Sequence, residues 1–275
     1  MRAAVGAAAL ALAAGSTAQA QGRLDARYTA SLAGLSIGKG AWFIDIGDDK
    51  YLAAASGRTA GILSLFSSGG GTGAARGSVI NGRLMPASYS ASISTSKRKN
   101  EVRITLKAGA VKDLDVSPPV SPDSGRVPLR AAHRRGVIDP MSASLMRVAS
   151  GADPLAPGTC RRKVSIFDGR MRYDLHLAYK RKEQVKAEKG YAGPALVCAV
   201  YFHPIAGHVP DRAAIRYLAK SRDVEAWMVP IAGTDILVPF RVSVPTPFGL
   251  GVVQATQFVT ATRRAQTTTS GVRSR

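Results

Sequence analysis

Apolar and polar residues alternate along most of the chain with a period of two, which is typical of half-buried β-strands. The alternation recurs in short stretches separated by glycine, proline and asparagine. This pattern predicts a mainly β protein with consecutive antiparallel strands and one or two short helices. We expect strands at residues 28–35, 40–46, 51–56, 84–95, 101–108, 196–202, 224–229, 236–244 and 250–260, while residues 59–66 fit a bent strand or a short helix.

Two dipeptides mark tight hairpin turns, because a two-residue turn needs positive φ angles that asparagine, aspartate and glycine adopt readily. Asn81-Gly82 is the first, and Asp168-Gly169 lies in the middle of the clearest hairpin, residues 160–180. A two-residue turn at Asp168-Gly169 predicts three facing pairs: Ile166 with Met171, Val164 with Tyr173, and Lys163 with Asp174.

Other segments predict loops and helices. Residues 112–128 hold four prolines and three acids and should form an exposed loop, and the glycines of residues 69–73 should form a flexible turn. Asp139 followed by Pro140 is a good helix start, so we expect a helix over residues 140–148. A second helix should cover residues 211–220, where apolar residues recur at helical spacing.

The N-terminus has the features of a secretory signal. Arg2 precedes an apolar stretch over residues 3–14, and small residues occupy the cleavage positions before Gln21. We expect cleavage after Ala20, export to the periplasm, and no transmembrane segment in the mature chain. Residues 21–262 should then form a single β-rich domain, and the basic residues 263–275 a disordered tail.

The charge is strongly positive, with a formal net charge of +20 for 275 residues. Such a surface attracts anions. Export removes nucleic acid as a partner and leaves anionic lipid, lipopolysaccharide or an acidic envelope protein. A general basic bias of the host is the competing interpretation, since the basic residues are spread along the chain.

Cys160 and Cys198 are the two cysteines of the chain. In an exported protein a pair of cysteines is usually bonded, so we expect a structural disulfide. A metal pair or a redox pair would call for CxxC spacing or a histidine at ligand spacing, and neither is present.

Catalytic motifs are missing from the sequence. There is no GxSxG elbow, and residues 69–73 lack the Gly-Lys-Ser/Thr ending of a phosphate-binding loop. His203 and His208 flank a turn and could meet around a metal or an acidic group, but turn structure is the interpretation that we favour for them. We therefore expect no enzyme, no cofactor and no metal; a hydrolase acting on peptidoglycan or lipid has only these two histidines in its favour.

Three segments resemble a known family. GVIDPMSA (136–143), CRRKVSIFDGRMRYDL (160–175) and VCAVYFHPIAGHVP (197–210) are similar to the bacterial envelope family known as domain of unknown function 3108. The resemblance implies a periplasmic location and a large curled antiparallel sheet, a β-spiral or half-barrel around an apolar interior, as in lipoprotein carriers. It implies no reaction.

Two functional hypotheses follow. The first is a non-catalytic periplasmic envelope protein that binds a lipid or another amphipathic ligand in the curled sheet. The second is a structural or protein-interaction module that supports envelope integrity. The candidate ligand or partner surface comprises the polar and aromatic residues of the two distinctive segments, unless these serve only the core and the turns: Arg170, Arg172, Asp174, Tyr201, Phe202, His203 and His208.

Overall fold

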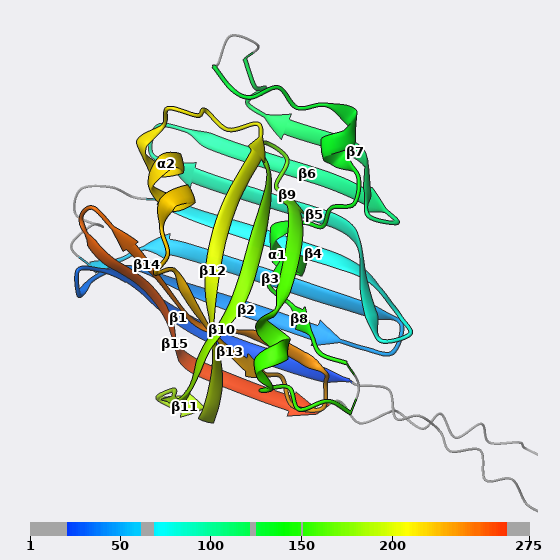
Figure 1. The fold of residues 1–275 in the computed structure, drawn as a ribbon, viewed down its shortest axis with the longest axis vertical. Coiled ribbons are helices and arrows are strands. Elements are labelled where there is room, and N and C mark those ends of the chain that lie inside the picture. Colours follow the sequence, from blue (N-terminus) through cyan, green and yellow to red (C-terminus); the bar gives the residue numbers. More distant parts are fainter. Residues whose placement is uncertain (1–20, 62–68, 122–124, 150, 263–275) are drawn as a thin grey trace, which may run out of the picture.

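The computed structural model describes residues 21–61, 69–121, 125–149 and 151–262. Within these ranges, one large antiparallel sheet curls on itself and two short α-helices accompany it (Figure 1), which confirms the predicted fold class. The predicted signal peptide, the C-terminal tail and most of residues 59–66 lie outside the described residues.

The sheet follows the chain up and down with few crossovers. Its order is β7-β6-β5-β4-β3-β2-β1-β15-β14-β13-β12-β10-β9. The strands are β1 (Gly22–Leu32), β2 (Leu35–Ile46), β3 (Lys50–Thr59), β4 (Gly69–Ile80), β5 (Arg83–Thr95), β6 (Lys99–Lys107), β7 (Ala110–Ser117), β8 (Met146–Arg147), β9 (Arg162–Phe167), β10 (Arg172–Lys186), β11 (Lys189–Gly190), β12 (Ala192–Ala206), β13 (Glu225–Pro230), β14 (Ile236–Thr246) and β15 (Gly249–Thr262). The helices are α1 (Pro140–Ala143) and α2 (Ala213–Lys220), with 3-10 turns η2 (Ala131–Arg134) and η3 (Pro157–Cys160).

The first and last strands are neighbours in the middle of the sheet. β1 pairs with β15 from Gly22 opposite Thr262 to Leu32 opposite Gly251. The two halves of the chain therefore meet through their terminal strands.

Val137 and Ile138 form a short strap that connects the two outer strands, β7 and β9. The Val137 N–H donates to the Gly109 carbonyl beside β7 (2.9 Å). The next residue, Ile138, bonds β9 in both directions: its N–H donates to the Ser165 carbonyl, and its carbonyl accepts from the Phe167 N–H, each at 3.0 Å. The strap thus supplies partners to both edges of the curled sheet where β7 and β9 do not pair with each other.

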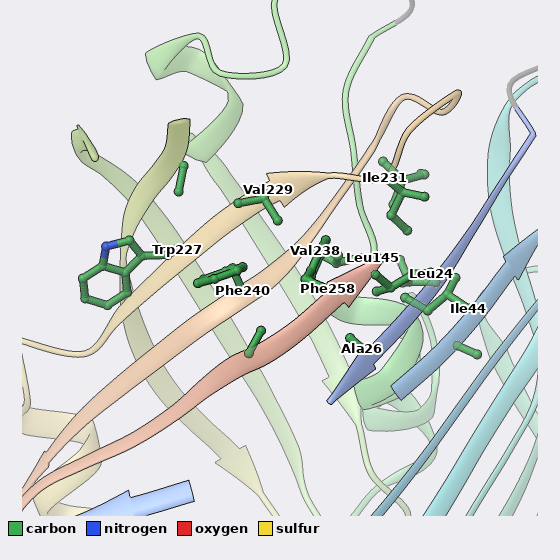
Figure 2. Close-up of a cluster of buried hydrophobic side chains, with 14 of the residues drawn as sticks. Leu24, Ala26, Ile44, Leu145, Trp227, Val229, Ile231, Val238, Phe240 and Phe258 are labelled. Atoms are coloured by element: carbon green, nitrogen blue, oxygen red, sulfur yellow. The ribbon is translucent and has the colours of Figure 1, made fainter. Parts of the chain in front are cut away.

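The largest buried cluster joins β1–β3 to β12–β15, because alternate residues of these strands face one another across the curl. Figure 2 shows its members packed together, and the Phe240 and Phe258 rings lie 5.6 Å apart. The labelled residues of the cluster are Leu24, Ala26, Ile44, Leu145, Trp227, Val229, Ile231, Val238, Phe240 and Phe258.

The hairpin at residues 160–180 forms, but the predicted register is wrong by two residues. Phe167 faces Arg172, so the loop has four residues, 168–171, rather than two. The Asp168 carboxylate explains the longer loop, since it accepts from the N–H groups of Arg170 (2.8 Å) and Met171 (2.6 Å). Asp174 faces Ser165 instead of Lys163.

The helices are shorter than predicted. Asp139 caps α1 as expected, accepting from the N–H groups of Met141 (3.0 Å) and Ser142 (2.8 Å). The helix nevertheless ends at Ala143, because residues 146–147 form β8 and pair with β14. Helix α2 begins at Ala213, two residues later than predicted, with Arg212 at the capping position.

Two expected loops contain strands. β7 occupies the first part of the segment 112–128, and β4 begins at Gly69, so the glycine cluster is not a turn. Strand pairing satisfies the backbone groups of both segments, which composition alone did not reveal.

The predicted disulfide is present. Cys160 and Cys198 are bonded, with Cα atoms 5.6 Å apart, and both are fully buried. Among the described residues, no helix is both long enough and apolar enough to cross a membrane.

Candidate ligand-binding trough

A row of glycines crosses the sheet on the face that carries the largest core cluster. Gly40 of β2 faces Gly57 of β3, which in turn faces Gly71 of β4. The row is bounded by Tyr28 of β1 and Ile93 of β5. Directly opposed residues in antiparallel strands point to the same face. The row therefore leaves a strip of sheet between two large side chains almost bare.

The next row is also made of small residues. Ala26, Trp42, Ala55, Gly73 and Ala91 face one another in sequence from β1 to β5. Apart from Trp42, none has a side chain larger than a methyl group. Together the two rows form the floor of a shallow trough.

Two adjoining hollows make up the trough, and they share the lining residues Ala55 and Ser56. The first, of about 270 Å³, lies between Tyr28, Trp42 and Arg241 and is almost entirely apolar. The second, of about 570 Å³, extends over the glycines of β4 to Ile93. A third hollow, of about 550 Å³, lies on the opposite face of the same strands, because its cations Arg27, Lys39 and Arg58 alternate with Tyr28, Gly40 and Gly57. The lining residues of the first hollow are Tyr28, Gly40, Ala41, Trp42, Ala55, Ser56, Pro239, Arg241, Val242 and Val253.

Tyr28 forms a fixed wall of the trough. Its hydroxyl donates to the Pro239 carbonyl on β14 at 2.7 Å. Burial raises the pKa of this phenol above its ordinary value, so it stays neutral.

A cation lies at one end of the apolar hollow. Arg241 faces Trp227 on β13, and its guanidinium carbon lies 4.6 Å from the centre of the indole ring. The Arg241 Nε is buried, and no hydrogen-bond acceptor among the described residues reaches it. An anionic group placed in the hollow would meet the positive charge of Arg241 and an Nε–H group that has no acceptor among the described residues.

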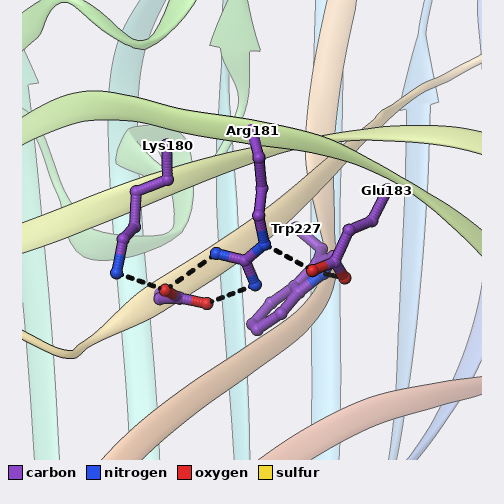
Figure 3. A network of polar contacts seen from close by, with 5 residues as sticks. Lys180, Arg181, Glu183 and Trp227 are labelled. Atoms are coloured by element: carbon purple, nitrogen blue, oxygen red, sulfur yellow. Dashed lines mark hydrogen bonds and ion pairs between the residues drawn. The ribbon is translucent and has the colours of Figure 1, made fainter.

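An ion-pair network holds Trp227 from its other side (Figure 3). Arg181 of β10 donates two hydrogen bonds to Glu225, at 3.0 and 2.9 Å, and Lys180 lies 2.6 Å from the same carboxylate. Glu183 accepts from the Trp227 indole N–H at 2.6 Å and is also bonded by Arg181. The network fixes the orientation of the indole that Arg241 stacks against.

The acids of the network are held ionised. The hydrogen bonds from Arg181 lower the pKa of Glu225 from 4.5 to about 2 against the effect of burial, and Lys180 assists. The Trp227 N–H, followed by Arg181, lowers the pKa of Glu183. At neutral pH both carboxylates are ionised and accept the hydrogen bonds that hold Arg181 and Trp227 in place.

The sequence-predicted surface residues form a separate set of contacts. Asp174 is 6% exposed and is contacted by Arg172 (2.6 Å), Lys163 (2.9 Å) and Ser165 (2.9 Å). Burial raises the pKa of this carboxyl, but the three hydrogen bonds outweigh burial and lower it overall. The expected Lys163–Asp174 pair thus forms diagonally, despite the shifted register.

The remaining predicted residues serve the packing of β9, β10 and β12. Arg170 donates to the carbonyls of Ser117 (3.0 Å) and Pro118 (2.9 Å) at the end of β7. Three others pair individually: Tyr201 lies under Arg222, Phe202 lies 5.3 Å from Tyr173, and the His203 ring lies 4.2 Å from that of His176. His208 is half-buried.

Of the seven residues, Arg172 contacts Asp174, and Asp174 faces His203 across the β10–β12 pair, but none of the seven lines the three hollows. Sequence reasoning missed the trough because the glycines of residues 69–73 resembled a turn. Their alternate spacing, together with Gly40 and Gly57 in neighbouring strands, was the available signal. Within the described ranges, no three histidine, cysteine or acidic side chains gather where they could hold a metal.

Comparison with known proteins identifies a family without an assigned activity. The family described as "Protein of unknown function (DUF3108)" matches residues 27–256. None of the curated proteins compared with the chain matches it. A solved structure of a beta-barrel-like protein of domain of unknown function DUF1849 from Brucella abortus is similar, with 8% identity, a TM-score of 0.48, and 90% of this chain and 100% of that chain covered. Because the family match spans most of the sequence, the chain belongs to the DUF3108 family.

Proposed function

We propose that this protein is a non-catalytic periplasmic protein that binds a lipid or another amphipathic molecule in the trough. One observation carries the proposal: a floor of glycine and alanine, with apolar walls, ends at the half-buried cation Arg241, whose Nε is buried. Large side chains normally cover the inner face of a curled sheet. Their replacement by glycine in one strip creates space that an acyl chain could fill.

The dimensions suit an amphiphile. The hollows of about 270 and 570 Å³ adjoin through Ala55 and Ser56, and together they fall within the range of small-molecule sites. An apolar chain would lie over the glycines of β3 and β4. An anionic head would lie by Arg241.

The periplasmic assignment rests on the sequence features of residues 1–20 and agrees with a disulfide, which persists in oxidising compartments. The non-catalytic assignment rests on the network beside the trough, where Glu183 and Glu225 are engaged by cations. These charges support Trp227 and are not free to exchange protons with a substrate.

A blocking substitution tests the proposal. A Cβ atom added at Gly57 would meet a single atom within 4 Å, the Lys39 carbonyl oxygen at 3.7 Å, so valine fits there and protrudes into the trough. We expect Gly57→Val to weaken binding of the fluorescent fatty acid cis-parinaric acid by about tenfold. Ser90→Val is the matched control, because Ser90 is exposed and lines none of the three hollows.

Lipid extraction of the exported wild-type protein gives an independent readout. Mass spectrometry should find a co-purified amphiphile that is depleted in Gly57→Val and retained in Ser90→Val. Equal fatty-acid binding by all three proteins, or no amphiphile and no binding in the wild type, would contradict the proposal.

A further inference from the structure

Two hairpin tips lie side by side at one end of the curled sheet. The β1–β2 turn is at residues 33–34, and the β14–β15 turn is at residues 247–248. The Ala33 N–H donates to the Leu250 carbonyl at 3.0 Å, which joins the two tips. The terminal pairing of Gly22 with Thr262 lies at the opposite end of the same strands.

These tips carry large apolar side chains in solvent. Phe248 is 80% exposed, Leu35 57% and Leu250 44%. Single exposed apolar residues are ordinary on protein surfaces, but a phenylalanine at the apex of a hairpin beside two leucines is a local concentration of such surface.

Cations surround the exposed tips. Helix α2 lies beside the β14–β15 hairpin, since Pro245 shares a surface hollow of about 440 Å³ with Arg216, Lys220 and Arg222 (Figure 1). The segment 211–223 holds four arginines or lysines against two aspartates. The β5–β6 turn, with Lys97-Arg98-Lys99, is at the same end of the sheet, because alternate turns of an up-and-down sheet share one end.

We propose that this end of the molecule is a membrane-docking rim that binds the surface of a bilayer containing anionic lipid. The rim comprises the apolar residues Leu35, Tyr217, Phe248 and Leu250 together with the cations Arg216, Lys220 and Arg222. Phe248 and the leucines enter the interface between headgroups, and the cations bind lipid phosphates.

The charge and shape of the rim favour a lipid surface over a protein partner. A protein interface needs a broad complementary patch, whereas here narrow tips project with cations beside them. Bilayer insertion needs apolar tips of this kind and positive charge next to them.

The trough reaches this end of the sheet. Ile37, Thr59 and Thr95 line its second hollow. Ile37 follows the β1–β2 turn, Thr95 precedes the β5–β6 turn, and Thr59 faces Gly38, the neighbour of Ile37. Docking would thus serve the proposed function, on which this inference rests, because a docked protein presents the mouth of the trough to the lipid that it binds.

Vesicle co-sedimentation tests the docking rim. The exported wild-type protein should sediment with vesicles of phosphatidylethanolamine and phosphatidylglycerol, and much less with phosphatidylcholine vesicles or at 0.5 M salt. Phe248→Ser should lower the partition coefficient for the anionic vesicles by about tenfold. Ile80→Ser is the matched control, since Ile80 is 54% exposed at the β4–β5 turn at the other end of the sheet.

The outcomes separate docking from ligand binding. Phe248→Ser should still bind cis-parinaric acid normally, and Gly57→Val should still dock on vesicles. The proposal is overturned if wild-type protein stays in the supernatant with anionic vesicles at low salt, or if Phe248→Ser and Ile80→Ser sediment alike.

Discussion

The substitution Glu225→Gln probes the ion-pair network that supports Trp227. Glu225 is 13% exposed, and its contacts with Arg181 and Lys180 lower its pKa from 4.5 to about 2. That difference corresponds to about 3 kcal/mol of folding free energy at neutral pH. Because the folded-state pKa is the lower one, this contribution is complete above pH 4.5 and is lost as the pH falls toward 2.

Urea unfolding of the wild type and of Glu225→Gln, at several pH values, measures the effect. We expect the variant to be less stable by about 3 kcal/mol at pH 7 and the difference to shrink steadily below pH 4.5. Asp115→Asn is the control: Asp115 pairs with Arg103 on the surface, with both side chains about two-thirds exposed, and should cost at most about 1 kcal/mol. A difference between wild type and Glu225→Gln that stays constant from pH 7 to pH 2.5 would refute the reasoning.

Two further substitutions test the supports of the fold. Replacing Cys160 and Cys198 together by alanine opens a cross-link between residues 38 apart and should cost about 4 kcal/mol in urea unfolding; an unchanged midpoint in non-reducing buffer would show that the bond adds nothing. Asp139→Ala removes the acceptor of two helix N–H groups and should cost about 1–2 kcal/mol, whereas Asp139→Asn, which keeps the acceptor, should cost less. Equal losses in the two Asp139 variants would count against a capping role.

The sequence predicted the strands better than their pairing. The alternation of residues and the Asn81-Gly82 turn led correctly to antiparallel hairpins. The hairpin at residues 160–180 failed in register because its turn was assumed to be closed by backbone bonds alone. In the structure the Asp168 side chain accepts two N–H groups, and this adds two residues to the loop. A side-chain bond of this kind leaves no trace in the hydrophobic pattern.

The trough could not be predicted from the sequence, because its residues come together only in the folded sheet. Gly40, Gly57 and Gly71 lie in three different strands, and each glycine separately resembles a turn or a flexible site. Arg241 is likewise one of 38 lysines and arginines in the sequence, and only the pairing of β13 with β14 shows that it faces Trp227. Cross-strand register decides both features, and one sequence does not reveal register over long distances.

The pairing of β1 with β15 constrains how the chain acquires its shape. Gly22 needs a partner at Thr262, so almost the whole chain must be available before the middle of the sheet can form. Closing so large a loop has a high entropic cost, and folds dominated by such distant contacts form slowly. During that interval, β1 exposes an unpaired edge that other chains could bind. The chain is therefore expected to fold only after its synthesis is complete, and to depend on protection from aggregation until β15 arrives.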